Sequence, residues 1–188
     1  TEIRQLQEQG LDGQGVRICM VDTGFSPTHS AFDGVEIVFK DMVGDSTEPV
    51  DYGTIGHGTM MAGLLISQSH QIGISPNVTL AVVAALSDNG DGVNSGDEAV
   101  VADAIRWCHQ EFNADIISLS LGGQQKPDSE REGASVSATR MAVDSGIFVV
   151  AAAGNDGGGD DDGMVSAPGN VARVITVGAT TKGGLIWS

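Results

Sequence analysis

The sequence has no hydrophobic run long enough to cross a membrane. A spanning helix needs about 18 to 20 consecutive apolar residues, and no run among the 188 residues approaches that length. No charged segment followed by an apolar one opens the chain, so no secretion signal is visible. Because the first residue is Thr1 and not methionine, this absence says little about the compartment. We expect no membrane contact and leave the localisation open.

Basic residues are scarce as well. Nine Lys and Arg stand against 25 Asp and Glu, and the formal net charge of -16 would repel a phosphate backbone. We therefore expect no nucleic-acid partner. A G-x-G-x-x-G motif and a P-loop are absent, which disfavours a nucleotide-binding domain. The acidic excess agrees equally well with a high-salt environment, with calcium binding and with solubility, and these three explanations stay open.

Only two cysteines occur. Cys19 lies in an apolar, strand-like run and Cys108 in a helical one, and neither has the spacing of a metal or redox motif. Free cysteine behaves as a small buried hydrophobic residue. We expect two buried thiols rather than a disulfide.

Glycine is abundant, with 27 residues gathered at the ends of apolar runs, which is too many for a helical bundle. Six apolar runs are typical of strands buried on both faces: 16–21, 35–39, 79–86, 115–121, 147–153 and 174–178. Helical patterns lie between them at 57–67, 96–112 and 133–144. The alternation predicts an α/β fold, a doubly wound and mostly parallel sheet with helices on both faces. With 40% hydrophobic residues, the chain can bury one core, so we expect a single domain over residues 1–188.

Polar residues and glycines follow three of the predicted strands. Asp22 comes after VRICMV, Gly122 after ISLSL and Asn155 after FVVAAAG. Doubly wound sheets bind their ligands outside the carboxyl ends of the strands. Each residue alone is more typical of a turn or a helix cap than of catalysis.

Four short motifs that follow one another along the chain are more informative than the single residues. They are VDTG at 21–24, HGTMMAG at 57–63, SLSLGG at 118–123 and AAAGN at 151–155. At these spacings the chain resembles the subtilisin-like serine proteases, from about residue 10 to its last residue. The resemblance implies hydrolysis of peptide bonds through an acyl-enzyme.

Three catalytic roles follow from this resemblance. Asp22 would orient His57 and stabilise the imidazolium that forms when His57 acts as acid and base, and Asn155 would bind the oxyanion. Gly58 and Gly63 would let the His57 helix pass close to its neighbours. Four apolar residues of this helix are expected to pack: Met60, Met61, Leu64 and Leu65.

The resemblance also implies a binding groove for an extended polypeptide, which would lie as an added strand between two edges. The edge beside the primary specificity pocket would be Ser120, Leu121 and Gly122. The opposite wall of that pocket would be Ala152, Ala153 and Gly154, and the second edge Gly90, Asp91 and Gly92. These small residues favour a large apolar side chain before the scissile bond.

One element of the family is missing. The GTSxA-type motif that carries the nucleophilic serine does not occur, and the sequence stops at TTKGGLIWS. We therefore expect the amino-terminal portion of a catalytic domain, incomplete at its C-terminal side and inactive alone. Sequence beyond residue 188, or a second chain, would supply the serine, and a propeptide is compatible with the family. The alternative is a catalytically inactive module that retains the groove and only binds peptides.

The proposed chemistry requires no cofactor, but the family often carries structural calcium, and Asp with backbone carbonyls suits that ion. For DGGGDDDG at 156–163 we favour a solvated loop over a calcium site, and for 87–92 the substrate-edge role accounts for the residues. Metal ligands stay unknown. We expect His29 to be structural and His70 and His109 to lie at the surface. The family's commoner habit slightly favours secretion.

Overall fold

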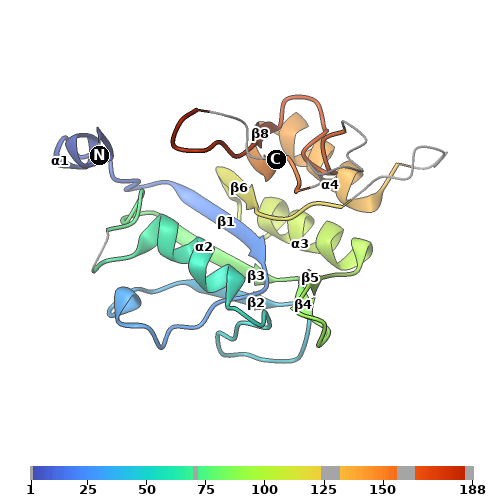
Figure 1. Cartoon of the computed structure of the whole chain (residues 1–188), viewed down its shortest axis with the longest axis horizontal. Coiled ribbons are helices and arrows are strands. Elements are labelled where there is room, and N and C mark those ends of the chain that lie inside the picture. Colours follow the sequence, from blue (N-terminus) through green and yellow to red (C-terminus); the bar gives the residue numbers. More distant parts are fainter. Residues whose placement is uncertain (1, 70–71, 124–131, 156–163, 185–188) are drawn as a thin grey trace.

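Six parallel strands form the centre of the molecule, in the order β2-β3-β1-β6-β7-β8 (Figure 1). The computed structural model describes residues 2–69, 72–123, 132–155 and 164–184. The strands are β1 (Arg17–Asp22), β2 (Val38–Asp41), β3 (Thr79–Ala84), β6 (Ile116–Leu119), β7 (Phe148–Ala152) and β8 (Ile175–Val177). This arrangement confirms the α/β fold with a mostly parallel sheet.

Helices cover both faces of the sheet (Figure 1). Because successive side chains of a strand point to opposite faces, Met20 of β1 faces α2 (His57–Ile66), whereas Val21 faces α3 (Glu98–Gln110) and α4 (Ala134–Asp144). A 3-10 turn (Ser30–Phe32) follows β1. Two further short elements were not predicted: α1 (Glu2–Glu8) and a hairpin of β4 (Ser87–Asp88) and β5 (Asn94–Ser95). In the described ranges, no helix combines the length and the apolar composition needed to cross a bilayer.

The two outermost strands depart from the expected burial. All three residues of β8 are exposed, and Val38 and Lys40 of β2 are exposed as well. Within the described residues, the expected burial on both faces is therefore not seen for these two strands. Both lie at the edges of the sheet, and an apolar run of this length does not indicate its place in the strand order.

Helix α2 lies very close to the end of β1. A Cβ added at Gly58 would be 2.1 Å from the carbonyl oxygen of Gly24, so the backbones meet without a side chain between them. The buried residues of α2 follow a helical spacing: Gly58, Ala62 and Ile66. Met60 and Leu64 point away from this stripe and are 46% and 60% exposed, so their expected packing was wrong. Met61 and Leu65 do pack against the core.

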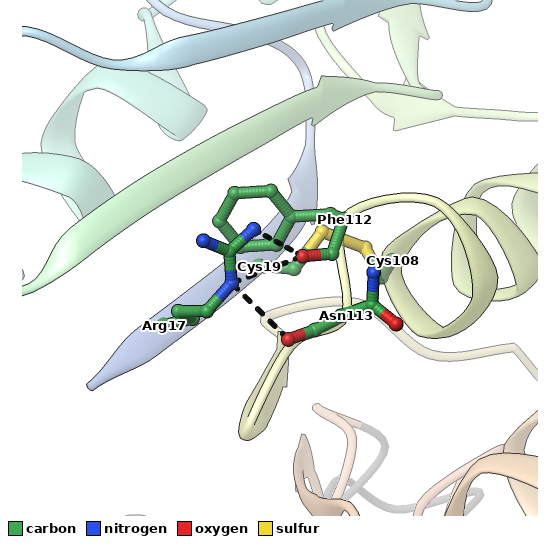
Figure 2. Close-up of a disulfide and its surroundings, with 5 residues drawn as sticks. All are labelled: Arg17, Cys19, Cys108, Phe112 and Asn113. Carbon is green, nitrogen blue, oxygen red and sulfur yellow. Dashed lines mark hydrogen bonds between the residues drawn. A yellow bond between two sulfur atoms is a disulfide. The ribbon is translucent and has the colours of Figure 1, made fainter. Parts of the chain in front are cut away.

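A disulfide joins Cys19 and Cys108, and the prediction of two free thiols was wrong (Figure 2). The residues are 89 positions apart in sequence, but α3 crosses the face of β1 on which Cys19 lies, and the two Cα atoms are 5.6 Å apart. Both cysteines are fully buried. The Arg17 guanidinium lies 4.2 Å from the centre of the Phe112 ring, and its Nε donates to the Phe112 and Asn113 carbonyls. Sequence separation concealed this contact.

The Asp41 carboxylate, at the end of β2, binds several groups of the segment that leads from β2 to α2. It accepts hydrogen bonds from the Tyr52 hydroxyl and from three backbone N–H groups, those of Val43, Gly44 and Ser46. Burial alone would raise the pKa of Asp41, but these hydrogen bonds outweigh it and hold the pKa below 3.8. The hydrogen bond that the Tyr52 hydroxyl donates to Asp41 raises the pKa of Tyr52 from 10.0 to about 12.

The titration of Tyr52 tests this arrangement directly, because it is the sole tyrosine of the sequence. We expect its phenolate absorbance to appear near pH 12 in the native protein and to move back toward pH 10 in Asp41→Asn. Since the folded pKa lies above the unfolded one, the stabilisation is complete below pH 10 and is lost as the pH rises toward 12. Urea-unfolded protein is the control. A native titration near pH 10 would contradict the hydrogen bond.

Candidate active site

Asp22 and His57, 35 positions apart, form a hydrogen-bonded pair. Asp22 is the last residue of β1 and His57 the first of α2, and His57 Nδ1 lies 2.7 Å from Asp22 Oδ1. The aspartate is completely buried, whereas the histidine side chain is 27% exposed. Because an ionised carboxylate only accepts hydrogen bonds, Nδ1 carries the proton, and Nε2 is left able to accept one. This is the geometry of an oriented general base.

Asp22 is buried, and its ionised form is stabilised by the hydrogen bond with His57. Burial raises the pKa of Asp22, and the hydrogen bond from His57 opposes that rise, as does the backbone N–H of Thr23 at 2.7 Å. The second oxygen, Oδ2, is buried and accepts no hydrogen bond from the described residues. A protonated His57 therefore faces a poorly solvated negative charge, an arrangement that stabilises an imidazolium.

Asn155 lies at the same cleft as His57. It follows β7, is exposed, and lines a cleft of about 510 Å³ together with His57. A side-chain amide here can donate to charge that develops on a bound carbonyl. The structure thus brings together the three residues that the sequence singled out.

The predicted groove residues divide into two groups. Those that line the cleft are Gly92, Ser120, Leu121 and Gly122. Those outside its lining are Gly90, Asp91, Ala152, Ala153 and Gly154. Residues 89–93 connect β4 to β5, and it is the β5 side, 92–96, that faces the cleft. The roles of all nine in substrate binding stay predictions.

The β4–β5 hairpin was missed by the sequence reasoning. Asp88 Oδ1 accepts hydrogen bonds from the N–H groups of Gly90 and Gly92, and Asp91 Oδ1 accepts one from Val93. Aspartate that bonds the backbone two residues onward is typical of a turn. The DNGDG sequence therefore contained a usable turn signal.

A backbone pairing between two residues that line the cleft was also missed. Gly123 and Ala167 exchange two hydrogen bonds of 2.9 Å as an antiparallel bridge. Next to it, the Ser166 N–H donates to the Ala153 carbonyl at 2.9 Å. Residues 166–168 thus connect the segment after β6 to the segment after β7.

The structure gives no support to a metal centre in the part of the chain that it describes, where no three His, Cys, Asp or Glu side chains are placed to hold an ion. Segment 156–163 and His70 lie outside the described residues, so the loop and calcium interpretations stay predictions. His29 Nδ1 accepts a hydrogen bond from the Ala31 N–H at 3.1 Å and caps the 3-10 turn, in keeping with a structural role.

Comparison with known proteins places the site in a family. Residues 13–187 match the model of the subtilase family, peptidase S8. The chain is 39% identical over 183 residues to serine protease AprX of Bacillus subtilis (strain 168), covering 91% of this chain and 39% of that protein. It is 31% identical over 181 residues to subtilisin DY of Bacillus licheniformis, covering 93% of this chain and 60% of that protein.

Solved structures agree on the fold. The prenylagaramide maturation protease PagA matches 98% of this chain and 61% of its own, with a TM-score of 0.76 and 21% identity. The protease domain of PatA, as its S218A mutant, matches 94% of this chain and 62% of its own, with a TM-score of 0.77 and 23% identity. The chain spans between about two fifths and three fifths of these four proteins. With its motifs, its sheet and its Asp22–His57 pair, the chain belongs to the subtilase family of serine proteases.

Proposed function

We propose that this chain is the amino-terminal portion of a serine endopeptidase domain that cleaves extended polypeptide through an acyl-enzyme. Asp22 orients His57, His57 is the general base and then the general acid, and Asn155 stabilises the oxyanion. The nucleophilic serine comes from sequence beyond residue 188 or from a second chain. The observation that carries this proposal is the 2.7 Å contact between His57 Nδ1 and Asp22 Oδ1 at the edge of a cleft that Asn155 also lines.

In the proposed reaction, His57 acts through Nε2, the ring nitrogen that does not contact Asp22. His57 Nε2 takes the proton of the serine hydroxyl as its oxygen attacks the scissile carbonyl, and Asp22 stabilises the resulting imidazolium. His57 then gives that proton to the leaving amine. Among the described residues no serine is hydrogen-bonded to His57, since the one side-chain partner of its ring is Asp22. The serine motif of the family does not occur in the sequence either, and we therefore assign the nucleophile to sequence beyond residue 188 or to a second chain.

The proposed substrate is an extended peptide between Ser120–Gly122 and the β5 side of the hairpin. Both segments line the cleft, and residue 120 follows the last residue of β6. An extended peptide placed beside such a segment gains backbone hydrogen bonds as an added strand. A large apolar side chain before the scissile bond remains our expectation for the primary pocket. A buried disulfide agrees with an oxidising compartment, and therefore with secretion.

Labelling with a fluorophosphonate tests the proposal. The complete gene product is incubated with the probe, and the labelled peptide is identified by mass. The proposal expects one labelled serine, located outside residues 1–188. Intact, folded protein that never labels but retains an unstructured peptide would overturn it in favour of the peptide-binding module.

The oxyanion role makes a separate prediction. In the complete protein, Asn155→Ala should lower kcat by about 10²- to 10³-fold and leave KM little changed, a scale known from the equivalent asparagine of subtilisin itself. The physical reason is that the amide donates to charge present only in the transition state. Asn77→Ala is the matched control, because Asn77 donates to Asp12 and does not line the cleft. An equal loss in both variants would argue against the role.

A further inference from the structure

We propose that Asp51 is a positioning residue for the general base. Its carboxylate holds the first turn of α2, and with it the His57 ring, against the end of β1 that carries Asp22. This inference rests on the proposed function, because positioning His57 matters only if the Asp22–His57 pair takes part in catalysis.

One oxygen of Asp51 caps the helix of His57. Oδ2 accepts hydrogen bonds from the Thr59 backbone N–H at 2.9 Å and from the Thr59 hydroxyl at 2.5 Å. The residue at the N-cap position itself is Gly56, with a φ of 61° and no side chain to supply an acceptor. A helix N-terminus needs acceptors for its free N–H groups and favours a negative charge. Asp51 provides both from outside the helix.

The other oxygen connects that cap to the strand of Asp22. Oδ1 accepts from the Thr23 hydroxyl at 2.7 Å and from the Gly53 N–H at 2.9 Å. The same Thr23 oxygen accepts a hydrogen bond from the Gly58 N–H at 2.9 Å. Thr23 is completely buried and directly follows Asp22. A continuous set of hydrogen bonds therefore connects Thr23, at the end of β1, and Asp51 to Gly58 and Thr59, the two residues of α2 that follow His57.

Backbone contacts fix Asp51 in this place. Asp51 forms an antiparallel bridge with Gly24, flanked by hydrogen bonds from the Phe25 N–H to the Val50 carbonyl at 3.0 Å and from the Tyr52 N–H to the Thr23 carbonyl at 2.8 Å. A Cβ at Gly24 would lie 2.0 Å from the Val50 oxygen. The segment thus cannot shift along β1 without breaking several contacts at once.

Asp51 stays ionised in the neutral pH range, in which a histidine can act as a general base. Burial alone would raise its pKa, but the hydrogen bonds from Thr23, Thr59 and Gly53 outweigh burial and lower it below 3.8. The four donors therefore meet an ionised carboxylate at neutral pH. Hydrogen bonds to an ionised acceptor are about twice as strong as neutral ones.

Asp41 offers a matched control. It is the last residue of β2, ten positions before Asp51, and also accepts four hydrogen bonds, but none of them comes from α2 or from β1. If Asp51 only stabilises the segment, the two aspartates should behave alike. If it positions His57, they should differ in catalysis and in the state of the His57 ring.

The experiment compares Asp51→Ala, Asp41→Ala, Thr23→Val and Thr23→Ser in the complete protein. Its readouts are kcat, KM and the low-field proton NMR signal of His57 Nδ1–H. Asp51→Ala and Thr23→Val should lower kcat by about 10- to 100-fold with KM unchanged, because small misplacements of a catalytic group cost on this scale, and both should weaken or shift the proton signal. Thr23→Ser keeps the hydroxyl and should restore both. Asp41→Ala should lower the melting temperature and leave kcat and the signal unchanged.

Two results would overturn the proposal: an unchanged kcat and proton signal in Asp51→Ala, or equal losses in Asp41→Ala. Should Asp51→Ala fail to fold, Asp51→Asn takes its place, because the amide keeps one oxygen and the side-chain shape. If the wild-type protein hydrolyses no peptide, the proposed function fails. The NMR comparison then decides the positioning role alone, since the signal needs only the Asp22–His57 pair.

Discussion

Replacing His57 by alanine in the complete protein is expected to lower turnover by about 10⁶-fold, the scale established for loss of the same residue in subtilisin. Without the imidazole, the proposed acceptor of the serine proton is lost, and Asp22 loses the hydrogen bond that opposes the rise of its pKa. Hydrolysis of a chromogenic peptide and labelling by a fluorophosphonate measure the effect. Both should be lost together.

His109→Ala is the control for this experiment. His109 lies in the last turn of α3, is partly exposed, and does not line the cleft. We expect its variant to retain activity. Peptide hydrolysis that survives His57→Ala undiminished would show that the Asp22–His57 pair is not the catalytic base.

Replacing both Cys19 and Cys108 by alanine is expected to lower the free energy of unfolding by about 2–5 kcal/mol. A crosslink between residues 89 positions apart restricts the unfolded chain strongly, and its loss also removes two buried sulfur atoms from the core. For a domain of this size, each kcal/mol corresponds to about 2–4 °C in the melting temperature. Urea unfolding of wild type and double variant, followed by circular dichroism, measures the difference.

Thiol alkylation supplies the control for that prediction. Both cysteines are fully buried beside Arg17 and Phe112. We expect a reductant to leave the disulfide intact in native protein and to release two alkylatable thiols in urea. Native protein that alkylates twice without any reductant would contradict the disulfide, and the double variant should then lose little stability.

The sequence was sufficient for the centre of the fold and for the contact between Asp22 and His57. Their resemblance to the motifs of the subtilisin-like proteases predicted that contact, and the structure places the two side chains 2.7 Å apart at the end of β1 and the start of α2. The buried strands β1 and β3 were predicted because strands that pack on both faces are apolar throughout.

Apart from the local β4–β5 hairpin, the main features that sequence reasoning missed depend on contacts between distant segments. Cys19 meets Cys108 because α3 crosses β1, which no spacing rule contains. Asp51 lies in a polar segment without periodicity, and its role appears only when its four donors are in place. Ile175 is exposed because β8 is an outer strand of the sheet that the described residues form, and an outer strand and a central strand can have the same composition.

The central place of β1 in the sheet limits the order in which its two edges can be paired as the chain is made. β1 pairs with β3 on one side and with β6 on the other, and β6 follows α3 in the chain. While the ribosome is still producing α3, one edge of β1 has no neighbour, and an open strand edge is a template for association with other chains. The Cys19 thiol is unpaired until Cys108, 89 residues later, has been synthesised. These are the two cysteines among the 188 residues, so one pairing is possible within this stretch, and once formed it holds α3 against the face of β1 on which Cys19 lies.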